Sequence, residues 1–270
     1  MIAKQEIQLK KAEQVYRREL LKILRPIFFI KPTGPRQKID PAAQLKRPLI
    51  NQKFYDLTAR LYNLGLIHAT ELIQQAAAIG EVELAFASYD KYAIDYLTEF
   101  TIDSMTYIAN DIKPDLINTL EEGYENGESI PKLSKRVSQV WELHKMQALR
   151  FTRTATNEIY NQAHMNRYID SGIVDGVKFT AYLDNRTSPQ CRMLNGTIWA
   201  LDDPSRISIP CHFFCRSRYS PYIGKIPGAR DFSKSIDGTE FSQDQIAKIQ
   251  GNITTFRSKY WDIPLREVPK

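Results

Sequence analysis

All three cysteines of this 270-residue chain, Cys191, Cys211 and Cys215, fall within one short stretch, and His212 stands among them. A chain that gathers all of its thiols in this way is expected to use them together. Three is an odd number, so disulfide pairing alone would leave one thiol over. In a reducing compartment, clustered Cys and His residues indicate a metal site more often than a disulfide.

A structural zinc site needs four Cys or His ligands in a tetrahedral arrangement. Cys191, His212 and Cys215 supply three, and the spacing His212-x-x-Cys215 suits a chelate. Cys211 or Asp184 would have to supply the fourth ligand. Three alternatives stay open here: zinc held by Cys191, Cys211, His212 and Cys215, reduced cysteines packed in a core, or a disulfide such as Cys191–Cys215.

The spacing of apolar residues predicts an α+β protein that is mostly helical, with a helical N-terminal region. A small domain follows, built of a long helix, short antiparallel strands and the Cys/His loop motif. The predicted helices span residues 3–26, 52–65, 68–79, 88–111, 114–126, 131–141, 143–171 and 242–259. The predicted domains are a basic helix with a Pro-rich arm (1–50), a helical region (51–127), the motif domain (128–224) and a C-terminal loop and helix (225–270).

Short strands are predicted on either side of the first motif loop, which begins at Asp184 and ends at Gly196; the second motif loop spans residues 209–216. Residues 177–183 alternate between apolar and polar types, and residues 197–200 are their expected hairpin partner. Asn195-Gly196 between them is a strong turn dipeptide. Gly172 ends the preceding long helix as a C-cap.

Two faces of the long helix differ in character. Ala148, Phe151, Ala155, Ile159 and Ala163 share one face and are expected to pack inward. The opposite face is either an ordinary solvated surface or a polar stripe that anchors the loops after the helix. We favour the stripe, because its residues are good partners for backbone groups rather than the usual Lys and Glu. They are Arg150, Arg153, Asn157, Asn161, His164 and Tyr168.

Positive charge is concentrated at the N-terminus. Residues 1–60 contain 14 Lys and Arg and 5 Asp and Glu, a net charge of +9, whereas the other 210 residues carry a net charge of −3. A basic arm indicates a polyanion or an acidic protein surface as partner, although a solvated helix with a basic linker has the same composition. The candidate contacts to nucleic acid or protein are Lys10, Lys11, Arg17, Arg18, Lys22, Arg25, Lys31, Arg36, Lys38, Lys46 and Arg47.

No apolar run approaches the roughly 18 residues of a membrane span. The charged N-terminus lacks the apolar core of a signal peptide. We therefore expect synthesis in a cytoplasm and no membrane partner.

The motif resembles that of the phage Mu F-like minor head proteins, also called phage head morphogenesis proteins, over roughly residues 128–222. The shared pattern reads R-T…N…D-x-R-T-x-P-x-C-x-x-L-x-G…P-x-H-x-x-C-R. It is carried by Arg153, Thr154, Asn157, Asp184, Arg186, Thr187, Pro189, Cys191, Leu194, Gly196, Pro210, His212, Cys215 and Arg216.

The chain departs from the family pattern at several positions. Family members often have cysteines where Ser188 and Ser217 stand, and usually a proline where Cys211 stands. The family's Arg-Thr-Glu ends in Ala155 here, and Glu158 one turn later is a candidate replacement for that carboxylate.

The resemblance implies a minor component of a tailed-phage head that associates with the portal protein during procapsid assembly. It also implies contact with packaged double-stranded DNA, a role at genome ejection, and capsid or scaffolding proteins as further partners. The expected location is the head interior near the portal, after assembly in the host cytoplasm. On this interpretation Asp184, Arg186, His212 and Arg216 are scaffold residues, with Arg186 or Arg216 paired to Asp184.

Two other classes of function compete with this one. The chain is a DNA-binding accessory protein if its basic N-terminal arm does the main work. A nuclease or toxin-like enzyme centred on His212 is the weaker alternative, since no phosphate-binding glycine loop or Ser-His-Asp set accompanies that residue. We expect no enzymatic activity.

Overall fold

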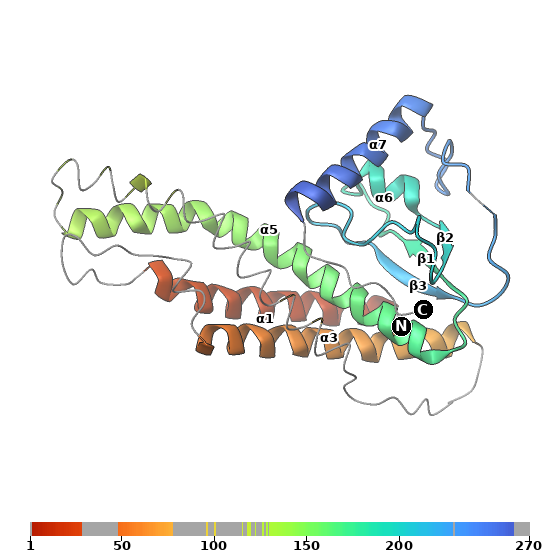
Figure 1. The fold of residues 1–270 in the computed structure, drawn as a ribbon, viewed down its shortest axis with the longest axis horizontal. Helices are drawn as coiled ribbons and strands as arrows, with labels where there is room; N and C mark the ends of the chain where they lie inside the picture. The colour runs from red at the N-terminus through yellow and green to blue at the C-terminus, as the bar shows by residue number, and fades with distance from the viewer. Residues whose placement is uncertain are drawn as a thin grey trace. The chain divides into compact units, whose positions relative to one another are not determined.

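The structure of the protein, a computed structural model, forms an α+β fold that is mostly helical, as predicted (Figure 1). The chain divides into two compact units, residues 1–59 with 91–152 and residues 60–90 with 153–270. The domain boundaries inferred from the sequence stay a prediction. The structure describes residues 2–28, 48–77, 96, 100, 115, 118, 119, 122, 126, 128, 130–228 and 230–261.

The helices are fewer and longer than predicted. The helix α1 (Ile2–Phe28) continues two residues past Pro26, although proline removes one backbone hydrogen-bond donor there. The segments 52–65 and 68–79 form one helix, α3 (Pro48–Ala76), and 131–141 and 143–171 form one helix, α5 (Ile130–Ser171). The predicted breaks in both were wrong. The helix predicted at 88–111 and that at 114–126 lie mostly outside the described residues.

Gly65 explains why α3 is not interrupted. A Cβ atom on Gly65 would lie 2.7 Å from the Cβ of Ala163 and 3.0 Å from the carbonyl oxygen of Tyr160, both in α5. The glycine therefore lets two helix backbones approach closely and is not a helix break. No Gly or Pro occurs in residues 132–171, so nothing in the sequence stops α5 before Gly172. Gly172 ends it with a φ of 64°.

The small sheet has the order β2–β1–β3 and is antiparallel throughout. The strand β1 (Gly176–Thr180) pairs with β2 (Ile198–Ala200) and with β3 (Arg218–Tyr222). The hairpin of β1 and β2 was predicted and is confirmed. The strand β3 was missed because it contains Pro221, a residue that strands tolerate only at sheet edges and bulges.

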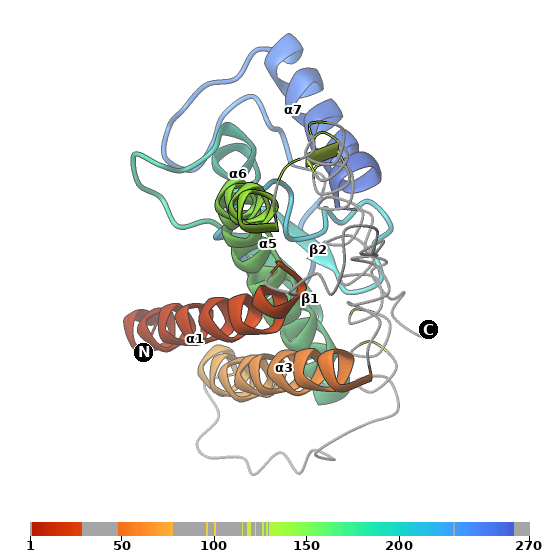
Figure 2. The same ribbon diagram turned by 90° about the vertical axis from the view of Figure 1, so that its left-hand side faces the viewer.

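Two helices complete this unit. The helix α6 (Pro189–Leu194) begins at the N-cap Ser188 and follows the first motif loop; its Ser-Pro start was interpreted as a turn, so the helix was missed. The helix α7 (Gln243–Thr255) begins with a capping box of Ser242 and Gln245 and continues as a π-helix, Phe256–Tyr260. The loop between β3 and α7 extends away from the sheet before it leads back to α7 (Figures 1 and 2).

The core of the second unit lies among the sheet, α6, α7 and the ends of α3 and α5. Val177 and Phe179 on β1 are fully buried, whereas Lys178 between them is exposed, as the alternation of a strand requires. Ile246, Ile249 and Ile253 on α7 belong to the same cluster. Within the described part of the chain, no helix combines the length and apolar character of a membrane span.

We expect Gly65→Ala to lower the free energy of unfolding by about 1–3 kcal/mol, because the new methyl group collides with the backbone of α5. Gly251→Ala is the matched control, since nothing lies within 4 Å of a Cβ at that position of α7. The control gains the ordinary helix preference of alanine over glycine, about 0.5–1 kcal/mol. Urea unfolding of both variants checks this, and equal midpoints would contradict the close approach of α3 and α5.

Candidate functional site

The polar stripe on α5 is buried from Asn157 to Tyr168 and is not a solvated surface there, whereas Arg153 near its beginning is exposed. Every residue from 154 to 165 is buried. Asn161 accepts a hydrogen bond at 2.9 Å from the backbone N–H of Tyr219 and donates one at 3.3 Å to the carbonyl of Ser217. The hydroxyl of Tyr168 donates to the carbonyl of Tyr219 at 3.1 Å. These bonds satisfy backbone groups of Ser217 and Tyr219 at the edge of β3 that faces away from β1.

The beginning of the stripe holds the second motif loop. The hydroxyl of Thr154 accepts a hydrogen bond at 3.2 Å from the backbone N–H of Phe214. Phe214 has a φ of 59°, a left-handed conformation that is rare for a non-glycine residue. The guanidinium of Arg153 lies over its ring, 5.7 Å from the centroid. Asn157 bonds within the helix, to Asn161.

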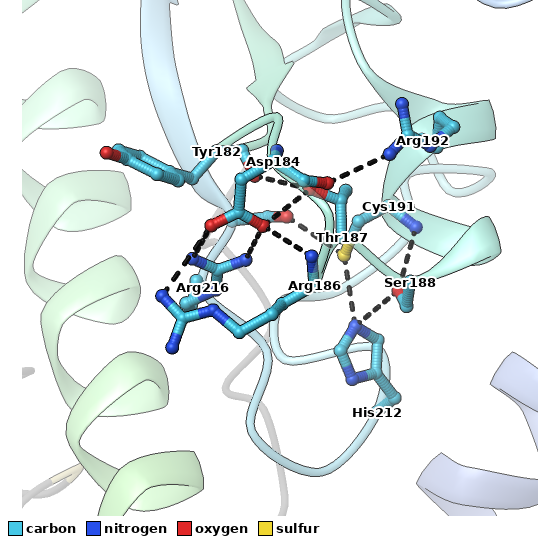
Figure 3. A network of polar contacts seen from close by, with 10 residues as sticks. Tyr182, Asp184, Arg186, Thr187, Ser188, Cys191, Arg192, His212 and Arg216 are labelled. Atoms are coloured by element: carbon cyan, nitrogen blue, oxygen red, sulfur yellow. Dashed lines mark hydrogen bonds and ion pairs between the residues drawn. The ribbon is translucent and has the colours of Figure 1, made fainter.

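An ion pair joins the two motif loops (Figure 3). Arg216 donates two hydrogen bonds to the Asp184 carboxylate, at 2.8 and 2.6 Å, the bidentate geometry that suits a guanidinium. The guanidinium of Arg186 is looser, at 3.6 Å, although its backbone N–H donates to Asp184 at 2.8 Å. The Arg216 guanidinium holds the pKa of Asp184 well below its usual range. Of the two predicted partners, Arg216 is thus the closer one.

Short local bonds shape the first loop. The hydroxyl of Thr187 accepts a bond from the backbone N–H of Asp184 and donates to the carbonyl of Tyr182, both at 2.7 Å. The Tyr182 ring lies 5.2 Å from the Arg216 guanidinium. Gly196, with a φ of 82°, donates its N–H to the carbonyl of Phe179 at 2.7 Å and so returns the chain to the sheet.

The three cysteines and His212 converge on one buried point. The Cys191 sulfur on α6 lies 3.8 Å from the sulfurs of Cys211 and Cys215, which are 4.0 Å apart. The Nε2 atom of His212 is 3.1 Å from the Cys191 sulfur. All four ligand atoms lie within 4.8 Å of one another, so this is a set that can hold a metal ion. Asp184, the other candidate for a fourth ligand, is bound to Arg216 instead.

Two serines flank this cluster, which we call the Cys/His cluster. The hydroxyl of Ser188 lies 2.8 Å from Nε2 of His212, and that of Ser217 donates to the Cys191 sulfur at 3.0 Å (Figure 3 shows the former). These are two of the positions at which the sequence departs from the motif that it resembles. The other ring nitrogen of His212, Nδ1, lies 2.6 Å from the carbonyl of Phe213 and can only donate to it.

Within the Cys/His cluster, the pKa of Cys215 is lowered and those of Cys211 and His212 are raised. Burial would raise the pKa of the Cys215 thiol, but hydrogen bonds from the neighbouring thiols and His212 hold it well below its usual value. Hydrogen bonds from Cys191 and Cys215 raise the pKa of Cys211. Burial lowers the pKa of His212, yet contact with Cys191 and Cys215 outweighs this and raises it to about 11.

A second buried group lies where the C-terminal helix docks. Glu158 of α5 is fully buried, accepts a hydrogen bond from the Trp261 indole and lies 3.5 Å from the Arg257 guanidinium. Burial raises the pKa of Glu158 to about 7. Trp261 and Phe256 also pack against Phe213 of the motif, with ring centroids 6.3 and 5.0 Å away. The sequence offered no sign of this contact beyond an amphipathic C-terminal helix.

The predicted basic residues of α1 line one side of that helix. Tyr16, Leu20 and Ile23 are buried, and Tyr16 packs edge-on against Phe54. On the opposite side, five of the predicted contact residues lie within an arc of about 140°, counted at 100° per residue. All five are exposed cations. We call this arc the basic face: Lys10, Lys11, Arg17, Arg18 and Lys22. The Arg25 side chain and Lys31, Arg36, Lys38, Lys46 and Arg47 lie outside the described residues.

Comparison with known proteins identifies one family. The family model described as Phage Mu protein F like protein matches residues 114–220. That range contains every residue that carried the resemblance in the sequence, and the resemblance is thereby confirmed. No curated protein and no solved structure matches the chain.

We expect Asp184→Asn to lower the melting temperature at neutral pH, because the bidentate ion pair with Arg216 is lost. A carboxylate whose pKa is depressed on folding stabilises the protein above its unfolded pKa, 3.8, and this contribution is lost as the pH falls below that value. The gap in melting temperature should therefore be constant from pH 6 to 8 and close below about pH 4. Asp202→Asn, on an exposed side chain, is the control; the same behaviour in both would contradict the ion pair's role.

Glu158→Gln should change the pH dependence of stability in the opposite sense. A carboxyl whose pKa is raised on folding contributes stability fully below its unfolded pKa, 4.5, and loses it as the pH rises to about 7. The wild type should therefore lose up to about 3 kcal/mol relative to the variant between pH 4.5 and 8, at about 1.4 kcal/mol per pKa unit. Urea unfolding at several pH values measures this. Parallel profiles for the wild type, Glu158→Gln and the exposed control Glu240→Gln would refute it.

Proposed function

We propose that this chain, whose residues 114–220 are similar to phage Mu protein F, is a minor head protein of a tailed phage that associates with the portal during procapsid assembly. The family is one of phage head morphogenesis proteins, so a part in building the phage head follows from the match. The match over the motif region is the observation that carries the proposal. We propose in addition that the chain associates with the portal and that its final location is the head interior near the portal.

The bonding of the motif residues supports a structural role for them. Asp184 and Arg216 bind each other, Thr154 binds the backbone of Phe214, and the Nδ1 of His212 binds a backbone carbonyl. The first of these contacts joins the two motif loops, the second joins a loop to α5, and the third fixes the His212 ring within its own loop. A catalytic His and its nucleophile must be in reach of a substrate, whereas the three thiols beside His212 are buried. We therefore propose a scaffold and no enzyme.

The basic face of α1 supports contact with an acidic partner. Its five cations are exposed, and the buried residues Tyr16, Leu20 and Ile23 hold the helix from the other side. Arg18 and Lys22 contact Glu19 of the same helix, at 3.0 and 2.9 Å. A rigid row of cations attracts either an acidic protein surface or the phosphates of DNA, and speeds association by steering.

Contact with packaged DNA is the second candidate function, and the same basic face favours it. Neutralising phosphates needs no sequence-specific contact and gives binding that weakens steeply as salt is added. This role is compatible with portal association during assembly in the host cytoplasm, and with capsid or scaffolding proteins as further partners. It becomes the main function if the portal is not bound.

Size-exclusion chromatography of the full chain mixed with the portal protein of the same genome tests the proposal. We expect co-elution at a defined ratio. Reversing three charges of the basic face, Lys10→Glu, Lys11→Glu and Arg17→Glu, should weaken it on the order of tenfold or more, because electrostatic complementarity is lost. The control reverses three exposed lysines elsewhere, Lys132, Lys135 and Lys248, and should leave co-elution intact.

Failure to co-elute, with the chain folded and the portal oligomeric, would overturn the portal assignment. Duplex DNA offered at several salt concentrations then decides the second candidate. Steeply salt-dependent binding that the basic-face variant loses would support it. Equal weakening by both triple variants would show that net charge, and not the basic face, drives the association.

A further inference from the structure

We propose that Cys191, Cys211, His212 and Cys215 bind one Zn²⁺ ion as a closed structural site. This inference does not depend on the proposed function, because it concerns how the motif loops are held and not what they contact. It also chooses among the three alternatives that the sequence left open. Its basis is the mutual geometry of four side chains that come from α6 and from the loop before β3.

The sulfur positions suit a tetrahedral zinc ion. With Zn–S bonds of about 2.3 Å, the sulfurs of a tetrahedral site lie about 3.8 Å apart. The three sulfurs here are separated by 3.8, 3.8 and 4.0 Å. A disulfide requires two sulfurs at about 2.0 Å and would leave the third cysteine unused. No pair of the three is singled out as closer than the rest.

The orientation of His212 adds an independent indication. Its Nδ1–H donates to the carbonyl of Phe213 at 2.6 Å, and the Nε2 atom faces the sulfurs. Zinc-ligating histidines are held in this way, with one ring nitrogen bonded to a carbonyl or carboxylate and the other on the metal. Reduced cysteines packed only as apolar residues would not need an imidazole aimed among them.

The surroundings resemble the outer shell of a metal site. Ser217 donates a hydrogen bond to the Cys191 sulfur at 3.0 Å, the kind of contact that stabilises a thiolate ligand. Ser188 accepts the backbone N–H of Cys191 and its hydroxyl lies beside His212. Neutral hydroxyls are not among the usual ligands of structural zinc, so these serines support the four ligands without replacing one.

Cys211 completes the set in this chain. Its side chain is fully buried, and its sulfur lies 3.8 Å from that of Cys191 and 4.0 Å from that of Cys215. With it the site has three sulfurs and one nitrogen, and no ligand position is left open for water. Such closed sites stabilise folds and do not catalyse hydrolysis. Binding would release the thiol protons to solvent and tie α6 to residues 211–215.

The test is the metal content of the full chain, purified under reducing conditions without chelator. We expect about one zinc per chain by elemental mass spectrometry, and loss of about 90% of it, roughly a tenfold fall in occupancy, in Cys211→Ser and His212→Ala. Ser205→Ala is the control, because that exposed side chain bonds Asp203 and is not among the residues of the cluster. It should retain the metal.

Replacement of zinc by Co²⁺ in the wild-type chain gives a readout that does not depend on the folding of a variant. A tetrahedral thiolate site shows intense d–d bands together with sulfur-to-cobalt charge transfer. Folded wild-type protein without zinc and without these bands would overturn the proposal. Thiol titration after denaturation then names the alternative: three reactive thiols mean packed reduced cysteines, and one means a disulfide.

Discussion

In the second unit, side chains of α5 take the place of a neighbouring strand and bond the backbone at β3. Asn161, buried in α5, bonds both the N–H of Tyr219 and the carbonyl of Ser217, while Tyr168 bonds the carbonyl of Tyr219. An edge strand normally leaves such groups to solvent or to another strand. Here a helix supplies the partners, so a sheet of only three strands is anchored along β3. The positions of the loops that carry the motif depend on this anchor.

Two further connections hold those loops, and each differs in physical kind. The ion pair of Asp184 and Arg216 joins the loops at a partly exposed point, where solvent and salt weaken it. The Cys/His cluster joins α6 to the second loop in the interior, where three sulfurs and an imidazole meet. If zinc occupies the cluster, the interior connection is the stronger of the two, since metal binding contributes directly to folding. The aromatic contact of Phe213 with Phe256 and Trp261 adds the C-terminal helix to the same assembly.

Much of this site was accessible from the sequence, because its parts are local or chemically distinctive. The strand pair β1 and β2 and the anchoring stripe on α5 were predicted, and so was a pairing of Asp184 with Arg186 or Arg216. Other features were not. The strand β3 is short and contains Pro221, the helix α6 has only 6 residues, and neither shows a hydrophobic period long enough to detect. Glu158 was considered as a carboxylate of the motif, whereas its neighbours are Trp261 and Arg257, about 100 positions away.

The sequence alone indicated the family resemblance, the helical character and the set of residues that carry chemistry, because these depend on residue type and on spacing along the chain. Only the tertiary structure decided which of them meet. It showed that Gly65 allows helix contact and does not end a helix, that Arg216 is the closer partner of Asp184, and that Cys211 joins the other thiols. The physical reason is that burial and contact are properties of residues distant in sequence. A periodic pattern specifies which face of an element is buried, but not which residue of another element fills it.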